Sequence, residues 1–318
     1  MRAITQEGYG LIEVLRMRDM AVPQLATRRV LVEVRAASVN AMDAHGLHGA
    51  ARLYAGLRRP RALVPGSDIA GIVVEVGPGV TFVQVGDEVF GTAPGAFAEY
   101  ASARQNGLVT KPANITFEEA AAIPIAGFTA LQGLRDHCGV RPGHEVLING
   151  AGGGVGTFAV QIAKALGARV TAVTGTHTVE LLRKLGADEV IDRTEQDFTR
   201  QAARYDAVLD VSADRPLRDT RRVLAPGGTL VLVGAAPGGF IPPLARLVAG
   251  LVRRRITKQR VVSYLAKLPR ADLLVLREMV EGGKLRPVVD RTYALAEVPQ
   301  ALQYAASRQA NGKIVITM

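Results

Sequence analysis

A glycine-rich turn, GAGGGVG, is the segment of this 318-residue chain whose residue types point most directly to chemistry. Ala151, Gly153 and Gly156 stand in the fixed positions of the Gly-x-Gly-x-x-Gly pattern, with alanine in the first position. A hydrophobic run precedes the turn and an unbroken helix-like run follows it. Such a turn lets main-chain amides approach a pyrophosphate at the N-terminus of the helix. The pattern predicts a dinucleotide site made of Ala151, Gly152, Gly153, Gly154, Val155 and Gly156.

The preference between the two nicotinamide dinucleotides depends on the residue about 20 positions further on, where NAD-specific sites place an acidic side chain. Gly175 stands there, followed by Thr176 and His177, and no acidic residue lies within residues 173–178. Glycine leaves room for a 2′-phosphate, to which the hydroxyl and the imidazole can donate. Arg193, after the next strand, can add a cation. These residues predict NADPH as the cofactor, and Gly234, at the end of another strand-like run, completes the predicted contacts.

The elements that must position this turn alternate between strand and helix from Glu145 onward. The runs EVLIN, RVTAV, EVID, YDAVLDV and TLVLV have strand character, helix-like runs separate them, and residues 260–265 can form a sixth strand. Such alternation is typical of βαβ units in a parallel sheet. A helix over residues 217–224 is predicted between the last two of those runs.

The first third of the chain instead consists of short strands. Residues 30–39 and 69–76 form two of them, and residues 82–91 are interpreted as a further strand pair. Strands joined by glycine turns favour a partly closed β-barrel. Thr116 and Glu119 then form a capping signal before an alanine-rich helix. Near the C-terminus we expect a helix over residues 272–281 and a strand over residues 313–317.

Composition restricts the classes of function. A net charge of +10 and an isoelectric point near 10.1 attract anions, but aromatic residues make up only 5% and the arginines are scattered, so nucleic-acid binding is not favoured. The single cysteine, Cys138, excludes an internal disulfide and a cysteine-rich zinc site, which points to a reducing compartment. No signal-peptide pattern opens the chain. We expect a cytoplasmic protein.

These motifs together, from GSDIAGIVVEVGPGV through ITFEEAAAIPIAGFTAL, GAGGGVG and GADEVID to NGKIVIT, resemble the medium-chain dehydrogenase/reductase superfamily. Within it, the chain is most similar to the zinc-independent quinone oxidoreductases, such as zeta-crystallin, over nearly its whole length. The resemblance implies an α/β protein with a GroES-like, partly open β-barrel over residues 1–123 and 267–318. It implies a Rossmann doubly wound parallel sheet over residues 124–266, and a homodimer.

The same resemblance implies roles for individual residues. Asn40 and Asp43 would stand near the nicotinamide, Thr129 near its ribose, and Lys313 would approach the cofactor from the C-terminal tail. Two alternatives stay open: Asn40 can be a strand-end residue that bonds its own backbone, and Asp43 can anchor the following loop. The family usually has tyrosine where this chain has Arg193, so the packing of the adenine is a point of difference.

The zinc-dependent branch of the superfamily has a cysteine where this chain has Asn40, and Gly-His-Glu where it has Gly66, Ser67 and Asp68. Its four-cysteine lobe is missing as well. His45 and His48 have no evident third ligand, and a catalytic zinc needs three. A reaction without a metal favours conjugated acceptors, because the charge that arrives with a hydride delocalises away from carbon. We predict hydride transfer to a quinone or to an α,β-unsaturated carbonyl.

The proton of this reaction would come from water, Tyr54, His48 or His45, and Tyr54 is included with Asn40 and Asp43 among the predicted catalytic residues. Two other functions remain open: a biosynthetic enoyl or ketone reductase for a larger substrate, and a cofactor-binding protein that interacts with partners or RNA. The apolar, basic segment over residues 240–260 is interpreted as a cover of the substrate cleft or a dimer contact, with membrane association as the alternative.

Overall fold

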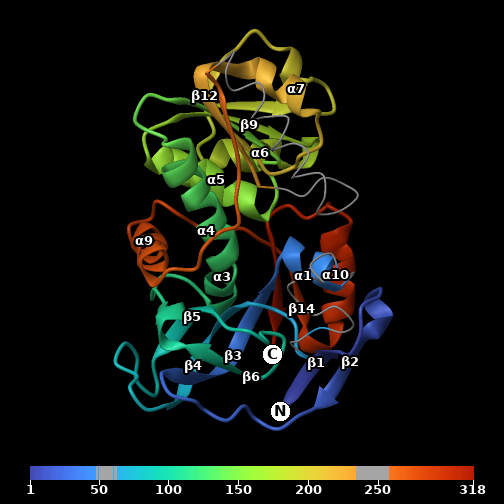
Figure 1. Cartoon of the computed structure of the whole chain (residues 1–318), viewed down its shortest axis with the longest axis vertical. Helices are drawn as coiled ribbons and strands as arrows, with labels where there is room; N and C mark the ends of the chain where they lie inside the picture. Colours follow the sequence, from blue (N-terminus) through green and yellow to red (C-terminus); the bar gives the residue numbers. More distant parts are fainter. Residues whose placement is uncertain (48, 50–59, 61–62, 234–257) are drawn as a thin grey trace. The chain divides into compact units, whose positions relative to one another are not determined.

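The computed structural model describes residues 1–47, 49, 60, 63–233 and 258–318 (Figure 1). The chain forms two compact units, Met1–Phe128 with Lys267–Met318, and Thr129–Ala266, which we call unit 1 and unit 2. The first boundary lies inside helix α4 (Pro124–Gln132), whereas the sequence predicts it between residues 123 and 124. The second lies between residues 266 and 267.

Unit 1 is built on a seven-stranded sheet with the order β14-β15-β3-β4-β5-β7, in which β6 also pairs with β3. All pairs of this sheet are antiparallel except β14 with β15. Its strands are β3 (Arg29–Val39), β4 (Asp68–Val76), β5 (Glu88–Thr92), β6 (Tyr100–Arg104), β7 (Leu108–Thr110), β14 (Val289–Ala294) and β15 (Lys313–Thr317). A separate antiparallel pair consists of β1 (Arg2–Gln6) and β2 (Leu15–Asp19).

The helices of unit 1 are short. They are α1 (Ala41–Leu47), α3 (Phe117–Ala121), α4, α9 (Arg270–Glu281) and α10 (Val298–Ala306), with 3-10 turns at Ile12–Val14, Gln105–Gly107 and Leu295–Glu297. The capping box at Thr116 is confirmed: its hydroxyl accepts from the Glu119 amide, and the Glu119 carboxylate accepts from the Thr116 amide. Of the strand pair predicted over residues 82–91, the second strand forms as part of β5, but residues 82–85 form no strand. That segment turns, because the Asp87 carboxylate accepts from the Gln84 amide.

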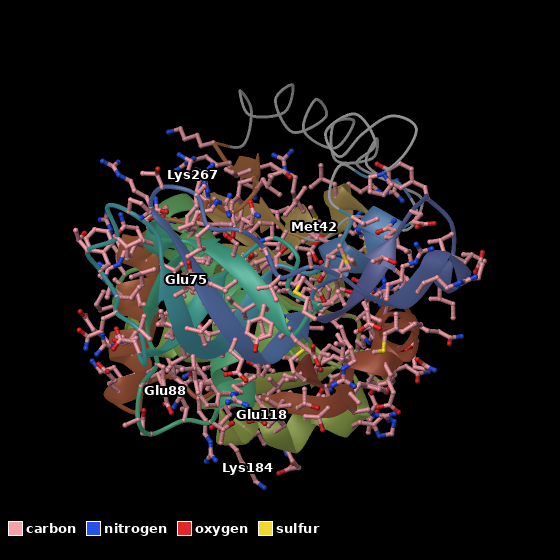
Figure 2. The ribbon with its side chains drawn as sticks, turned by 90° about the horizontal axis from the view of Figure 1, so that it is seen from below. Met42, Glu75, Glu88, Glu118, Lys184 and Lys267 are labelled. Atoms are coloured by element: carbon pink, nitrogen blue, oxygen red, sulfur yellow. The ribbon has the colours of Figure 1, made fainter. Side chains whose placement is uncertain are left out.

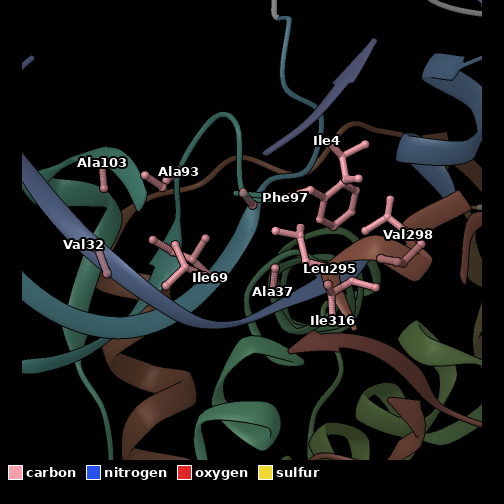
Figure 3. Close-up of a cluster of buried hydrophobic side chains, with 14 of the residues drawn as sticks. Ile4, Val32, Ala37, Ile69, Ala93, Phe97, Ala103, Leu295, Val298 and Ile316 are labelled. Carbon is pink, nitrogen blue, oxygen red and sulfur yellow. The ribbon is translucent and has the colours of Figure 1, made fainter. Parts of the chain in front are cut away.

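The hydrophobic core of unit 1 joins segments from both ends of the chain (Figure 3). Ile4 and Phe97 from the first third meet Leu295, Val298 and Ile316 from the last, and all are buried. Removing such side chains from water is the main favourable contribution to folding. The C-terminal segments, drawn in red in Figure 1, therefore complete the N-terminal barrel-like unit. Figure 2 draws the described side chains as sticks, among them Glu75 of β4 and Glu88 of β5.

Unit 2 contains the predicted parallel sheet, with the order β10-β9-β8-β11-β12-β13. Its strands are β8 (Glu145–Asn149), β9 (Arg169–Thr174), β10 (Glu189–Asp192), β11 (Tyr205–Asp210), β12 (Leu224–Leu232) and β13 (Arg260–Ser263). Numbered within the unit, this order is 3-2-1-4-5-6, which is that of a Rossmann fold. The predicted fold class is confirmed, and the sixth strand is β13. Ligands of such sheets bind at the carboxyl ends of the strands, where the strand order reverses.

The helices of unit 2 are α5 (Gly154–Ala165), α6 (Val179–Lys184) and α7 (Leu217–Thr220), with 3-10 turns at Thr176–Thr178, Phe198–Arg200 and Arg221–Val223. The helix predicted over residues 217–224 is thus shorter than expected, because residue 224 already begins β12. A π-helical segment, Gly133–Cys138, follows α4 and ends at Gly139, whose φ is 64°. None of the helices in the described ranges is long and apolar enough to pass through a bilayer.

Candidate active site

The glycine turn of unit 2 leaves no room for a side chain at Gly152 or Gly156. A Cβ atom at Gly156 would lie 2.2 Å from the carbonyl oxygen of Gly150, and one at Gly152 would lie 2.5 Å from the hydroxyl oxygen of Thr178. Gly150 itself has a φ of 82°, which favours glycine. These glycines let β8, the turn and α5 approach one another closely.

Gly153 differs from them. It is the N-cap of α5, with a φ of −83° that any residue can adopt, and a Cβ atom there would find only the Gly150 carbonyl oxygen, at 3.6 Å. No side chain caps α5, and its first turn holds no acidic residue. The main-chain amides at this N-terminus are therefore available for an anion, as a pyrophosphate would need. The residues present fit a bound dinucleotide, with an open surface at Gly153 that a side chain would fill.

A polar cluster borders this turn at the carboxyl ends of β8 and β11. The side-chain amide of Asn149 donates to Asp210, at 2.8 Å, and to Asp214, at 2.9 Å. The Ala213 amide also donates to Asp210, at 2.8 Å. The guanidinium of Arg193 lies 3.9 Å from the other carboxylate oxygen of Asp214. The cluster holds the loop after β11 beside the glycine turn, and the sequence analysis did not identify it.

The predicted 2′-phosphate residues are partly brought together. A Cβ atom at Gly175 would meet only Nε of Arg193, at 3.9 Å, so Arg193 passes in front of Gly175. The Thr176 hydroxyl lies 3.1 Å from the hydroxyl of Thr194, a residue that the sequence analysis did not include. His177 is exposed in the same 3-10 turn.

The predicted nicotinamide residue Thr129 lies in unit 2, near the end of β13. The hydroxyl of Tyr264, just after that strand, donates to the carbonyl oxygen of Thr129. Burial raises the pKa of Tyr264 above its ordinary value, and the ring of His137 packs against it, with 4.2 Å between the ring centroids. Tyr264 is a second residue that the sequence analysis did not single out.

In unit 1, Asn40 lies at the end of β3, directly before α1. Its side chain does not bond its own backbone, which was the alternative left open. Its Oδ1 accepts from the ammonium of Lys313, at 2.7 Å, and its Nδ2 donates to Asp68, at 2.8 Å. The polar side chain of Asn40 is thus held between a cation and an anion.

Asp68, the first residue of β4, lies at the centre of this cluster. Its carboxylate accepts from the Ser38 hydroxyl at 3.0 Å and from the Ile125 amide, in the first turn of α4, at 3.1 Å. The Lys313 ammonium is 3.7 Å away, and neither side chain is exposed by more than 3%. Burial raises the pKa of Asp68 and lowers that of Lys313, while the opposite charge of each partner counteracts the shift.

Asp43 makes the anchoring contact that the sequence left open, and its place near the nicotinamide stays a prediction. Its carboxylate accepts from the Asn40 amide at 2.7 Å, as an anchor of the first turn of α1. Burial, reinforced by the charge of Asp68, raises the pKa of Asp43 to about 7, against the effects of the Asn40 amide and of Lys313. A carboxyl group with this pKa is partly protonated at neutral pH, which suits a general acid.

Three predicted residues, Tyr54, His48 and Gly234, lie outside the described residues, as does the basic segment over residues 240–257. His45 lies on α1 and is half-buried. The ranges that the structure describes contain no group of three or more His, Cys, Asp or Glu side chains able to hold a metal ion. Beside Asn40 and Asp68, the positive charge is supplied by Lys313.

Comparisons with known proteins agree with this architecture. Residues 26–113 match the alcohol dehydrogenase GroES-like domain family, and residues 185–316 match the zinc-binding dehydrogenase family. The chain is 31% identical over 330 residues to the chloroplastic quinone-oxidoreductase QR1 of Triphysaria versicolor. That alignment covers 99% of this chain and 98% of the relative. The chain is 32% identical over 333 residues to the NADPH-dependent alkenal/one oxidoreductase of Arabidopsis thaliana, covering 99% of this chain and 79% of the relative.

Solved structures give the same result. The quinone oxidoreductase from Coxiella burnetii superposes with a TM-score of 0.86 at 29% identity, over 100% of this chain and 99% of the other. A GroES-like unit combined with a Rossmann unit defines a dinucleotide-dependent oxidoreductase. The chain belongs to the quinone oxidoreductase family of the medium-chain dehydrogenase/reductase superfamily, as its motifs predict. It is an NAD(P)-dependent oxidoreductase by family.

Proposed function

We propose that this protein is a metal-independent reductase that uses NADPH to reduce a quinone or the carbon–carbon double bond of an α,β-unsaturated carbonyl. The proposal rests above all on the buried cluster around Asn40, which presents an amide fixed by Lys313 and Asp68 next to a carboxyl group, Asp43, that is partly protonated at neutral pH. A fixed donor and a proton source are the help that a conjugated acceptor needs.

The dinucleotide would be held by main-chain amides of the glycine turn and of the first turn of α5, with Gly153 providing the open surface. The 2′-phosphate would be received by Gly175, Thr176, His177 and Arg193, because Gly175 leaves space and Arg193 offers a cation. The Asp192 carboxylate, which accepts from the Thr194 hydroxyl, also lies at this end of the sheet. When bound, the reduced nicotinamide supplies a hydride. Thr129 would lie at its ribose.

On the substrate side, each group of the cluster has a distinct task. Asn40 uses one hydrogen of Nδ2 for Asp68, and its second hydrogen can donate to the substrate oxygen. Protonated Asp43 can deliver the proton that balances the hydride, so that one hydrogen pair is added to the acceptor. Quinones and enones fit this arrangement, because the negative charge develops on an oxygen that hydrogen bonds can stabilise.

The relatives support the substrate class, since two carry the names quinone-oxidoreductase and alkenal/one oxidoreductase. They do not favour the alternatives of a biosynthetic reductase for a larger substrate or an RNA-binding protein. The NADPH preference is also consistent with the name of the Arabidopsis thaliana relative. A homodimer and a cytoplasmic location stay predictions.

The direct test is oxidation of NADPH by the purified protein with a panel of acceptors, after dialysis against a zinc chelator. We expect turnover with quinones, enals or enones, none with the matching saturated ketones and aldehydes, and no loss after chelation. We also expect kcat to fall as the pH rises through about 7, in step with the raised pKa of Asp43. Zinc-dependent oxidation of alcohols without turnover of any conjugated acceptor would refute the proposal.

A further inference from the structure

The first turn of helix α1 is capped by the Asp43 side chain and not by that of Asn40, the residue that directly precedes the helix. An asparagine at an N-cap normally uses its side chain to accept from main-chain amides of the first turn. Asn40 directly precedes α1 but bonds Lys313 and Asp68 instead. The cap is closed from the other side, because the Asp43 carboxylate, at the third helical position, accepts from the Asn40 amide. The Asn40 side chain therefore makes no capping bond to α1 and is held by Lys313 and Asp68.

Lys313 is one part of that fixation. An ammonium group has three hydrogens to donate. In the structure they face the Val39 carbonyl oxygen at 3.1 Å, Oδ1 of Asn40 at 2.7 Å and the Asp68 carboxylate at 3.7 Å. With a side chain exposed by only 3%, Lys313 directs its charge into unit 1: it makes two hydrogen bonds there and an ion pair with Asp68.

Asp68 is the other part. Its two carboxylate oxygens accept from Ser38 in β3, from Asn40 just after β3, and from Ile125 in α4. Its ion-pair partner, Lys313, belongs to β15. One side chain at the start of β4 thus ties together the ends of three other elements.

We propose that Asp68 and Lys313 form a positioning pair, which fixes the Asn40 side chain and the first turn of α1 for the reaction, and that Lys313 itself does not bind the dinucleotide. The inference rests on the proposed function, because it concerns how the substrate-side groups of that reaction are held. It assigns Asp68 a role that the motifs alone do not give it.

The pair also has an electrostatic effect that a merely structural contact would not have. The charged groups that act on Asp43 are Asp68 on β4, which raises its pKa, and Lys313 on β15, which lowers it by less. Helix α10 packs against α1, and its titratable residue, Tyr304, donates to Asp290; α1 itself carries His45. Removing the charge of Asp68 therefore lowers the pKa of Asp43, whether or not Lys313 keeps its proton.

The test compares the wild type with Asp68→Asn and with the double variant Asp68→Asn/Lys313→Met. The double variant is included because Asp68→Asn alone leaves a buried ammonium without its counterion, which endangers folding. The pKa of Asp43 is followed by NMR of 13C-labelled carboxyl groups, and its signal is identified by its loss in Asp43→Asn. This readout does not depend on activity.

We expect the titration midpoint of Asp43 to fall by about one pH unit in Asp68→Asn and by less in the double variant. We expect kcat with a quinone or enone to fall at least about tenfold in both, while the Kd for NADPH stays within about threefold of the wild type. The control is Gln105→Leu, which removes a buried amide of unit 1 that bonds only Thr81 and Gly79. It should leave the Asp43 midpoint and kcat unchanged.

An unchanged Asp43 midpoint in both variants would overturn the positioning pair. A Kd for NADPH that rises more than about tenfold in the double variant would show that Lys313 binds the dinucleotide, and would overturn the second part. If the wild type reduces no quinone or enone and yet the midpoint shifts as expected, the pair stands and the proposed function fails. The two failures are therefore distinguishable.

Discussion

The ammonium of Lys313 donates to Oδ1 of Asn40 at 2.7 Å, across 273 residues of sequence. The bond joins the first residue of the last strand, β15, to the residue between β3 and α1. The substrate-side cluster of unit 1 is therefore not complete until the C-terminal strand has joined the sheet.

The burial of Lys313 predicts a large loss of stability when its charge is removed. Lys313→Met leaves the Asp68 carboxylate buried without its counterion, and we expect it to lower the free energy of unfolding by about 3 to 5 kcal/mol. Urea denaturation followed by circular dichroism measures this change.

The matched control is Lys111→Met. Lys111 is also nearly buried, with 7% of its side chain exposed, but it donates to two carbonyl oxygens and its acidic partner, Glu88, is half exposed. We expect a cost of about 1 kcal/mol, because no buried charge is left unpaired. An equal cost for the two variants would show that the Lys313–Asp68 pair is not the cause.

Asp43 predicts a specific pH dependence of stability. Its pKa is about 7 in the folded protein and 3.8 as a free side chain, chiefly because burial disfavours the charged form. The folded state thus holds the proton more tightly, so this contribution to stability is fully present below pH 4 and is lost as the pH rises through 7. The loss is at most about 4 kcal/mol, because the Asp43 side chain is only half-buried and solvent screens part of the effect.

The measurement is the difference in unfolding free energy between the wild type and Asp43→Asn from pH 4.5 to 8. The amide keeps an acceptor for the Asn40 amide but does not titrate, so all other carboxyl groups cancel in the comparison. We expect the wild type to lose its advantage progressively over this range. A constant difference would mean that Asp43 has an ordinary pKa.

The fold was largely predictable because its strongest signals are local. Each strand of the parallel sheet is a short apolar run before a turn, and the capping box at Thr116 involves residues three positions apart. Helices α1 and α10 were not predicted. Helix α1 has only seven residues, including Gly46, and it is stabilised by the Asp43 cap and by packing on α10 rather than by its own pattern. Such packing is not visible in a local sequence.

The candidate site likewise has a local part that the sequence predicts and a non-local part that it does not. The glycine turn was predictable, because its residues are adjacent and Gly152 and Gly156 stand where a side chain does not fit. The bonds of Asp68 to Asn40 and Lys313 were not, because the partners are brought together only by strand pairing. A signal did exist: Asp68 replaces the glutamate of a metal-site motif, but without its partners it suggested only an absent zinc. The Asn149–Asp214–Arg193 cluster was missed for the same reason.

Two alanine substitutions in the glycine turn should separate packing from binding. Gly153→Ala should fold normally, because the added methyl group meets only one atom at 3.6 Å, yet raise the Kd for NADPH at least about tenfold by filling the surface for the pyrophosphate. Gly156→Ala should instead destabilise the protein, since its Cβ would lie 2.2 Å from the Gly150 carbonyl oxygen. Thermal melts and cofactor titrations of both variants test this. Normal NADPH affinity in Gly153→Ala would place the cofactor elsewhere.

Arg193 offers the sharpest test of cofactor preference. It passes in front of Gly175, and its ion pair with Asp214 is long, at 3.9 Å, so a 2′-phosphate with its greater charge can replace that carboxylate. Arg193→Gln should raise the KM for NADPH about tenfold and change the KM for NADH less than twofold. Arg218→Gln, which removes an arginine of unit 2 with 74% of its side chain exposed, controls for the loss of positive charge and should affect neither. Equal weakening of both dinucleotides by Arg193→Gln would mean that Arg193 contacts a part they share. The preference for NADPH would then have to come from another group of this turn, such as the exposed His177.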